Sequence, residues 1–172
     1  MNRKGFTLVE IMIVVAIIAL LAAIAIPNLL RARLNANEAA TIEALKTISG
    51  AATSWASVNN AAYPPTLADM TAPGMVLAGV LGPPFLDDTF NAATPNRNGY
   101  TLVYTAADVS VPADLILDQF YVTAAPMGPG ITGSRVFYVD DAGVVCAAPQ
   151  TTPIAAAHAG GACPPAPYVA LQ

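Results

Sequence analysis

Charged side chains are scarce in this sequence. Asp, Glu, Lys and Arg make up 10% of its 172 residues, and 7 basic residues face 11 acidic ones, for a formal net charge of −4. Loss of the two positive charges of Arg3 and Lys4 would lower this sum to −6. A protein that binds nucleic acid directly needs basic residues clustered on one face. The other basic residues are scattered along the chain (Arg31, Arg33, Lys46, Arg97 and Arg135), which argues against that class.

The groups that enzymes and metal sites use are also few. His158 is the one histidine, and neither a G-x-S-x-G nucleophile elbow nor a phosphate-binding loop occurs. Cys146, His158 and Cys163 match no zinc-site spacing. The pairs Asp87-Asp88 and Asp140-Asp141 could contribute to a calcium site, although such sites need six to eight oxygens and these carboxylates fit loops and turns equally well. We therefore expect no catalytic residue, no enzyme activity and no cofactor, with calcium as a weaker alternative.

What the sequence does contain is a long apolar run near its start, "MNRKGFTLVEIMIVVAIIALLAAIAIP". Every residue from Ile11 to Ile26 is Ile, Met, Val, Ala or Leu. With Phe6–Val9 in front, the run reaches the roughly 20 residues that cross a bilayer as a helix. Glu10 lies inside this run, where a charge costs about 2.5–3.5 kcal/mol on insertion scales. Glu10 therefore needs a partner.

Two ordinary N-terminal segments explain part of this pattern. A secretory signal peptide has a basic start and a small-residue cleavage site such as "LAAIA", but its apolar stretch is only about 7–15 residues long. A plain signal anchor fits the length, and Arg3 and Lys4 would keep its N-terminus in the cytoplasm. Neither explains Glu10 or the sharp boundary between Gly5 and Phe6.

The segment "KGFTLVEIMIVVAIIALLAAIAIPNLLRAR" resembles the class III leader and N-terminal helix of type IV pilins and pseudopilins. The resemblance implies that a prepilin peptidase/methylase cleaves after Gly5 and methylates the new amino terminus at Phe6. It implies that Glu10 neutralises the Phe6 amine of a neighbouring subunit during assembly. The implied partners are identical subunits in a helical filament and a pilus assembly platform in the inner membrane. The implied location is the inner membrane for the precursor and then an extracellular pilus on the cell surface.

The chain divides into four segments on this interpretation. Residues 1–5 are the leader, 6–30 the transmembrane or filament-core helix, 31–60 an amphipathic half of the same helix and 61–172 a globular head. In the amphipathic half the apolar residues recur every three or four positions: Leu34, Ile42, Leu45, Ile48, Ala52 and Trp55. Pro27 predicts a kink. Because no Gly lies between Phe6 and Ser49, extensive melting of the helix is less expected than in many relatives.

The head is predicted to be α+β, with the type IV pilin fold. A Pro- and Gly-rich loop over 61–99, with one helical turn at Thr66–Met70, precedes a four-stranded antiparallel sheet over 100–148. The strand candidates are 100–106, 120–126, 134–140 and 144–148, and "DDAG" at 140–143 predicts a turn between the last two. Export would favour a disulfide between Cys146 and Cys163, closing a loop over 146–163.

The leading function is a structural one. We expect a major pilin, which polymerises through its N-terminal helix into a type IV pilus for adhesion, motility or DNA uptake. The alternative is a pseudopilin of a type II secretion system. A membrane-anchored binding protein or enzyme is a third class, which predicts an uncleaved leader and a converging polar site.

Overall fold

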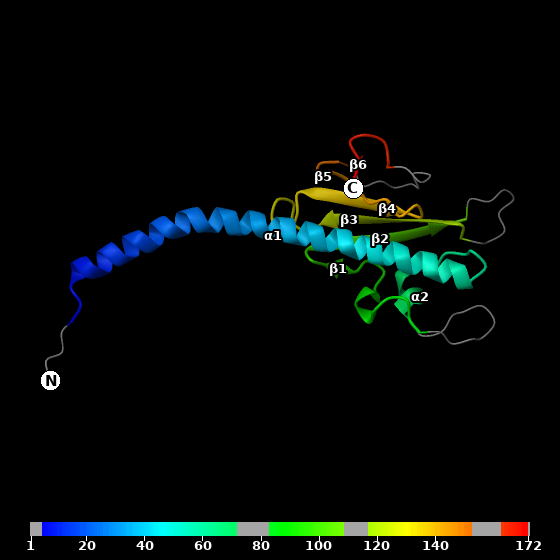
Figure 1. The fold of residues 1–172 in the computed structure, drawn as a ribbon, viewed down its shortest axis with the longest axis horizontal. Coiled ribbons are helices and arrows are strands. Elements are labelled where there is room, and N and C mark those ends of the chain that lie inside the picture. The colour runs from blue at the N-terminus through cyan, green and yellow to red at the C-terminus, as the bar shows by residue number, and fades with distance from the viewer. Residues whose placement is uncertain (1–4, 72–82, 109–116, 153–162, 172) are drawn as a thin grey trace.

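The protein consists of one very long helix and a head built on an antiparallel sheet (Figure 1). This computed structural model describes residues 5–71, 83–108, 117–152 and 163–171. Helix α1 spans Leu8–Val58, α2 spans Leu67–Thr71, and a 3-10 turn, η1, spans Asp88–Phe90. The strands are β1 Asn96–Arg97, β2 Tyr100–Ala107, β3 Gln119–Pro126, β4 Arg135–Asp140, β5 Cys146–Pro149 and β6 Val169–Ala170. They form one sheet in the order β1-β2-β3-β4-β5-β6, with each strand antiparallel to the next.

Helix α1 begins and ends at identifiable caps. Thr7 is the N-cap and precedes the apolar run directly. At the other end Asn59 is the C-cap, and its side-chain amide donates to the carbonyl of Trp55 at 3.0 Å. Asn60 and Ala61 then adopt positive φ angles of 53° and 64°, which the helix cannot continue through. The helix ends at Val58, two residues before the predicted boundary at 60, and it starts at Leu8 rather than Phe6 because Thr7 serves as its cap.

The second half of α1 packs on the sheet and forms the main core. Leu45, Ile48 and Ala52 are completely buried, and Trp55 is nearly so. They meet side chains from one face of the sheet: Tyr100, Leu102, Phe120, Val122, Ala124, Phe137, Val139 and Ala147. Each large aliphatic side chain buried in this way contributes about 1.5–3 kcal/mol. The predicted apolar stripe is confirmed in its centre, whereas Leu34 and Ile42 at its start are only half-buried.

The sheet has six strands and not the four that the sequence predicted. The four predicted strands correspond to β2–β5, and the two additional ones lie at its edges. β1 pairs with β2 through a two-residue turn, Asn98-Gly99, in which both residues have positive φ angles of 51° and 77°. Asn-Gly favours this hairpin turn. β6 pairs with β5 through Ala147 and Val169. Both edge strands are two residues long, too short for an alternating pattern to show.

The loop predicted over 61–99 also contains more regular structure than expected. The helical turn predicted at Thr66–Met70 is present as α2, one residue later. Leu67 and Met70 of α2 are buried in the main core. η1 and β1 follow in the same segment.

The opposite face of the sheet is covered by the C-terminal segment. Cys146 of β5 forms the predicted disulfide with Cys163, seventeen residues later in the chain. Tyr168 packs beside them against Tyr138 of β4, with ring centroids 6.4 Å apart. Cys146 belongs to a cluster with Val136, Tyr138, Ala148 and Tyr168 that is separate from the main core under α1. The disulfide therefore fastens the C-terminal segment over a second, smaller core.

An ion pair between a buried carboxylate and a partly exposed arginine joins α1 to the sheet at the point where the helix enters the head. Glu38 is 4% exposed, and its Oε2 accepts from both Nη2 and Nε of Arg135 at 2.8 Å. Its Oε1 accepts from the backbone N–H and the hydroxyl of Ser134 at 2.8 and 2.7 Å. Burial alone would raise the pKa of Glu38, but these bonds and the Arg135 charge hold the pKa below its ordinary value. Glu38 is thus ionised and fully hydrogen-bonded.

We predict that Glu38→Gln destabilises the head by about 2 kcal/mol, since charge-assisted hydrogen bonds are lost at a buried site. Because the pKa of Glu38 is lowered in the folded state, its contribution is complete above its ordinary pKa and disappears as the pH falls through the folded-state pKa. The stability difference between wild type and Glu38→Gln should therefore shrink between about pH 5 and pH 3. Denaturant unfolding of the full chain in detergent measures this. Glu43→Gln, at an exposed site on the same helix, should leave stability within about 0.5 kcal/mol at every pH.

We predict that Cys163→Ser lowers the unfolding free energy by about 3 kcal/mol, because the bridge closes a loop of about seventeen residues. Unfolding of the wild-type chain with and without a reducing agent is the matching measurement. An equal midpoint for the oxidised and reduced chains would contradict a stabilising role.

Candidate functional site

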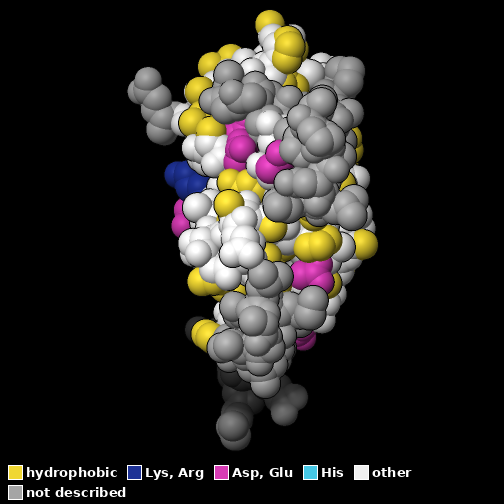
Figure 2. All heavy atoms as spheres, turned by 90° about the vertical axis from the view of Figure 1, so that its right-hand side faces the viewer, with side chains coloured by type: hydrophobic (Ala, Val, Ile, Leu, Met, Phe, Trp, Pro, Cys, Tyr) yellow, Lys and Arg dark blue, Asp and Glu magenta, His cyan; other side chains and the backbone are white. Residues whose placement is uncertain are grey.

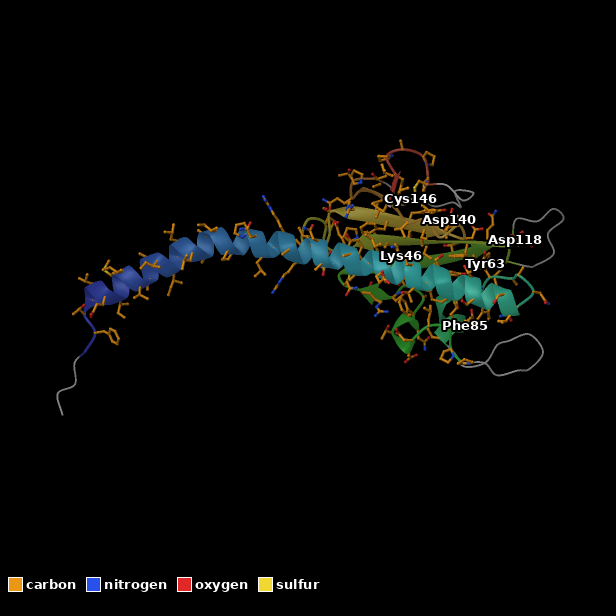
Figure 3. All side chains as sticks on the ribbon, in the orientation of Figure 1. Lys46, Tyr63, Phe85, Asp118, Asp140 and Cys146 are labelled. Carbon is orange, nitrogen blue, oxygen red and sulfur yellow. A yellow bond between two sulfur atoms is a disulfide. The ribbon has the colours of Figure 1, made fainter. Side chains whose placement is uncertain are left out.

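The first half of α1 is apolar and touches nothing else in the described structure. Side chains from Leu8 to Leu30 project outward all round this part of the helix (Figure 3). By length and composition α1 can cross a membrane: its most apolar window has a mean hydropathy of 3.0 and is not buried. Removing so much apolar surface from water is strongly favourable. This segment therefore requires an apolar environment, either lipid or other protein.

The polar groups at the start of α1 form a reciprocal cap. The backbone N–H of Thr7 donates to Oε2 of Glu10 at 2.8 Å, and the Thr7 hydroxyl donates to the same oxygen at 2.7 Å. In return the Glu10 N–H donates to the Thr7 hydroxyl at 3.3 Å. This is a capping box, in which two unsatisfied N–H groups of the first turn find acceptors. The sequence analysis missed this role of Thr7, although Thr-x-x-Glu before an apolar run is its recognised signal.

The predicted cleavage and methylation positions lie just outside this cap. Gly5 has open space around its Cα, and the Phe6 side chain is 85% exposed. Phe6 is one residue from Thr7 and four from Glu10, so the structure brings the three together at one helix end. Residues 1–4 of the predicted leader lie outside the described residues. Cleavage after Gly5, methylation of Phe6 and pairing of Glu10 with a neighbour remain predictions.

Pro27 lies inside α1, and the helix continues through it. Figure 1 shows α1 as a bowed rod without a break. A proline removes one backbone donor from the helix interior, and the first half of α1 has no packed neighbour among the described residues that would oppose a bend. A local kink at Pro27 remains a prediction.

The carboxylates proposed for calcium have local roles. Asp87 caps η1 by accepting from the N–H of Thr89 at 2.8 Å, and it lies 3.9 Å from Nη1 of Arg97. Asp140 accepts from the N–H of Ala142 at 3.2 Å in the turn after β4. Across residues 5–71, 83–108, 117–152 and 163–171, no three His, Cys, Asp or Glu residues are grouped so as to hold a metal. Cys146 and Cys163 are joined to each other, and His158 lies outside the described residues.

The far end of the head shows no basic cluster among its described residues. Figure 2 views that end and shows acidic side chains at several places, with basic ones at one margin. A nucleic-acid-binding face would show the opposite distribution. The apolar half of α1, with the cap at its start, is therefore the candidate functional site of the chain.

Comparisons with known proteins match the same end of the chain. The family model described as the prokaryotic N-terminal methylation motif matches residues 1–26. The type IV wide pilus major component PilA4 of Thermus thermophilus is 68% identical over 37 residues, which are 22% of this chain and 28% of that protein. The similarity thus spans little more than a quarter of that relative. No solved structure matches the chain. The N-terminal end of α1, which remains apolar and exposed ahead of the α+β head, thus carries the prokaryotic N-terminal methylation motif and is similar there to a type IV pilin.

Proposed function

We propose that this chain is a major pilin, a structural subunit that polymerises through the first half of α1 into a type IV pilus. The observation that supports this most directly is the division of α1. Residues 34–58 are partly buried on the head, whereas Leu8–Leu30 are exposed. A helix of 51 residues is about 76 Å long at 1.5 Å per residue. Its free half can reach well away from the head into a bilayer or a bundle of equivalent helices.

The same apolar segment serves two successive environments in this proposal. In the precursor, it spans the inner membrane. In the filament, which lies outside the cell, it packs against the equivalent segments of neighbouring subunits. Repetition of one heterologous contact, with a rotation that does not close, produces a helical fibre. Adhesion, twitching motility and DNA uptake are the roles that such a fibre would serve.

Glu10 would contribute a negative charge to this assembly, and its partner would be the amino group of Phe6. Cleavage after Gly5 would remove Arg3 and Lys4 and leave an α-amino group on Phe6, whose reference pKa is about 8, so it is protonated near neutral pH. Methylation keeps that charge. Two opposite charges in an apolar bundle neutralise each other, and loss of one leaves the other uncompensated, at a cost of about 3–5 kcal/mol. Both Thr7 bonds go to Oε2 of Glu10. The cap thus fixes the carboxylate at the helix end, where it would meet the Phe6 amine of a neighbouring subunit.

A pseudopilin of a type II secretion system would share the motif and the long helix. The disulfide-closed C-terminal segment and the PilA4 relative favour a pilin. Long surface filaments seen by electron microscopy of the native cell would support the pilin, and short periplasmic ones the pseudopilin.

Mass spectrometry of the N-terminal peptide from native cells tests the processing. We expect a peptide that begins at Phe6 and carries one added methyl group. A start at Met1 would indicate a permanent anchor, and a start near Ile26 a secreted protein. Either result would contradict the proposed function.

Substitutions at the cap separate the charge of Glu10 from its capping role. Gln can take the same place in a capping box, so Glu10→Gln keeps the cap and removes the charge. We expect Glu10→Gln and Glu10→Ala to insert into the membrane and to form no filaments, as judged by fractionation and microscopy. Thr7→Ala keeps the charge and weakens the cap by about 1 kcal/mol, so its filaments should persist. Normal filaments from Glu10→Gln would refute the charge pairing.

A further inference from the structure

Two apolar side chains are exposed at the base of the head, beside the point where α1 leaves it. Met127 and Ile131 lie in the segment between β3 and β4 and are 59% and 78% exposed. Elsewhere on the described head, Val169 of β6 is 66% exposed, and Val103 and Val144 are 37% and 39% exposed. Ile131 is thus the most exposed large apolar side chain of the described head. We call Met127 and Ile131 the base patch.

The base patch is held in place by a dense set of backbone hydrogen bonds. The N–H of Met127 donates to the carbonyl of Gly99 at 2.9 Å, and the N–H of Ile131 to the carbonyl of Gly128 at 2.9 Å. The side-chain amide of Asn37, on α1, donates to the carbonyl of Thr132 at 3.0 Å. The patch is therefore ordered before any partner arrives, which reduces the entropic cost of binding. It also lies level with Asn37 along α1.

We propose that the base patch docks onto the apolar half of α1 of another copy of this chain. This inference rests on the filament function proposed above. The occupant is apolar because the patch is apolar. It is a copy of the chain because the free half of α1 is the large apolar surface that every neighbour in such a filament presents. The segment between β3 and β4 that carries the patch lies next to α1 at the end of the head from which the free half extends (Figure 1).

The pairing of Glu10 with a neighbour's Phe6 fixes which part of that helix is in reach. When the neighbour's Phe6 lies level with Glu10, the neighbour's helix is displaced by about four residues, or about 6 Å, towards the head of the first subunit. One such step would bring the neighbour's Arg33 level with Asn37, where a charge would meet the apolar patch. Two steps bring Leu29 to that level, and Leu29 is exposed in the single subunit. The base patch should therefore contact the helix around Leu29 of the copy two steps away.

A lipid surface is the competing occupant. Asn37 lies about 10 Å beyond Leu30 along the helix, so the patch could reach the headgroup layer when Leu8–Leu30 span the bilayer. In the proposed filament, which lies outside the cell, the patch would be left in water unless another subunit covers it. A neighbouring helix is therefore the occupant that the structure favours.

Cysteine cross-linking in sheared filaments tests the contact directly. The double variant Ile131→Cys with Leu29→Cys should form covalent multimers after mild oxidation. The control, Ile131→Cys with Val9→Cys, should stay monomeric, since Val9 lies about 30 Å further down the helix. Normal filaments in which the first variant gives no multimers, or in which both variants give the same multimers, would overturn the proposal.

A charge placed on the patch tests its importance. Ile131→Glu should reduce filament yield at least tenfold while Phe6 processing, the disulfide and the melting temperature of the head stay unchanged. Val144→Glu, at the opposite end of β4, should assemble as the wild type does. Wild-type yield from Ile131→Glu would overturn this inference and leave the proposed function intact, whereas a wild-type chain that forms no filaments would overturn both.

A second experiment tests the lipid alternative by combining Ile131→Glu with Glu10→Gln, a variant that should insert into the membrane without assembling. Loss of membrane-bound monomer there would assign the patch to lipid and overturn the docking contact.

Discussion

The constraint on which this structure depends is that one continuous helix must suit two surroundings. The second half of α1 is amphipathic and supplies one wall of the head's core through Leu45, Ile48 and Trp55. The first half is apolar on every side and has no partner within the described chain. No loop separates the two halves, so the head and the free segment are joined by one continuous helix. Whatever the free half binds therefore positions the head as well.

The two acidic residues of α1 that make polar contacts at the ends of its exposed half are Glu10 and Glu38. Glu38 stands at the boundary, and its ion pair with Arg135 satisfies a buried carboxylate while linking helix to sheet. Glu10 stands at the free end, where the capping box satisfies backbone groups that lipid could not. Thus two of the acidic residues in a chain poor in charge lie at the two ends of the exposed half.

The sequence predicted the parts of the fold that depend on long, periodic patterns. The helix, its amphipathic half and the strands β2–β5 each show such a pattern, and the pairing of Cys146 with Cys163 needed only the two cysteines and an oxidising compartment. β1 and β6 are too short to show a period, although Asn98-Gly99 indicated the first. The partners of Glu38 could not be predicted, because Ser134 and Arg135 lie almost a hundred residues away and meet it only through the sheet. Glu10 stands out in the sequence by its place inside the apolar run, whereas its bonds to Thr7 were not predicted, although the Thr-x-x-Glu pattern indicates them.

The way α1 lies against the sheet also determines how the protein would bear tension. In Figure 1 the helix runs along the strands, with its free half extending from one end of the head. A pull along the free half therefore loads the helix–sheet contact in shear, so that the buried side chains from Leu45 to Trp55 resist together. A contact peeled open from one end would instead fail one residue at a time. The ion pair between Glu38 and Arg135 lies at the end of the helix–sheet contact that is loaded first, so it would resist such a pull as well as join the helix to the sheet.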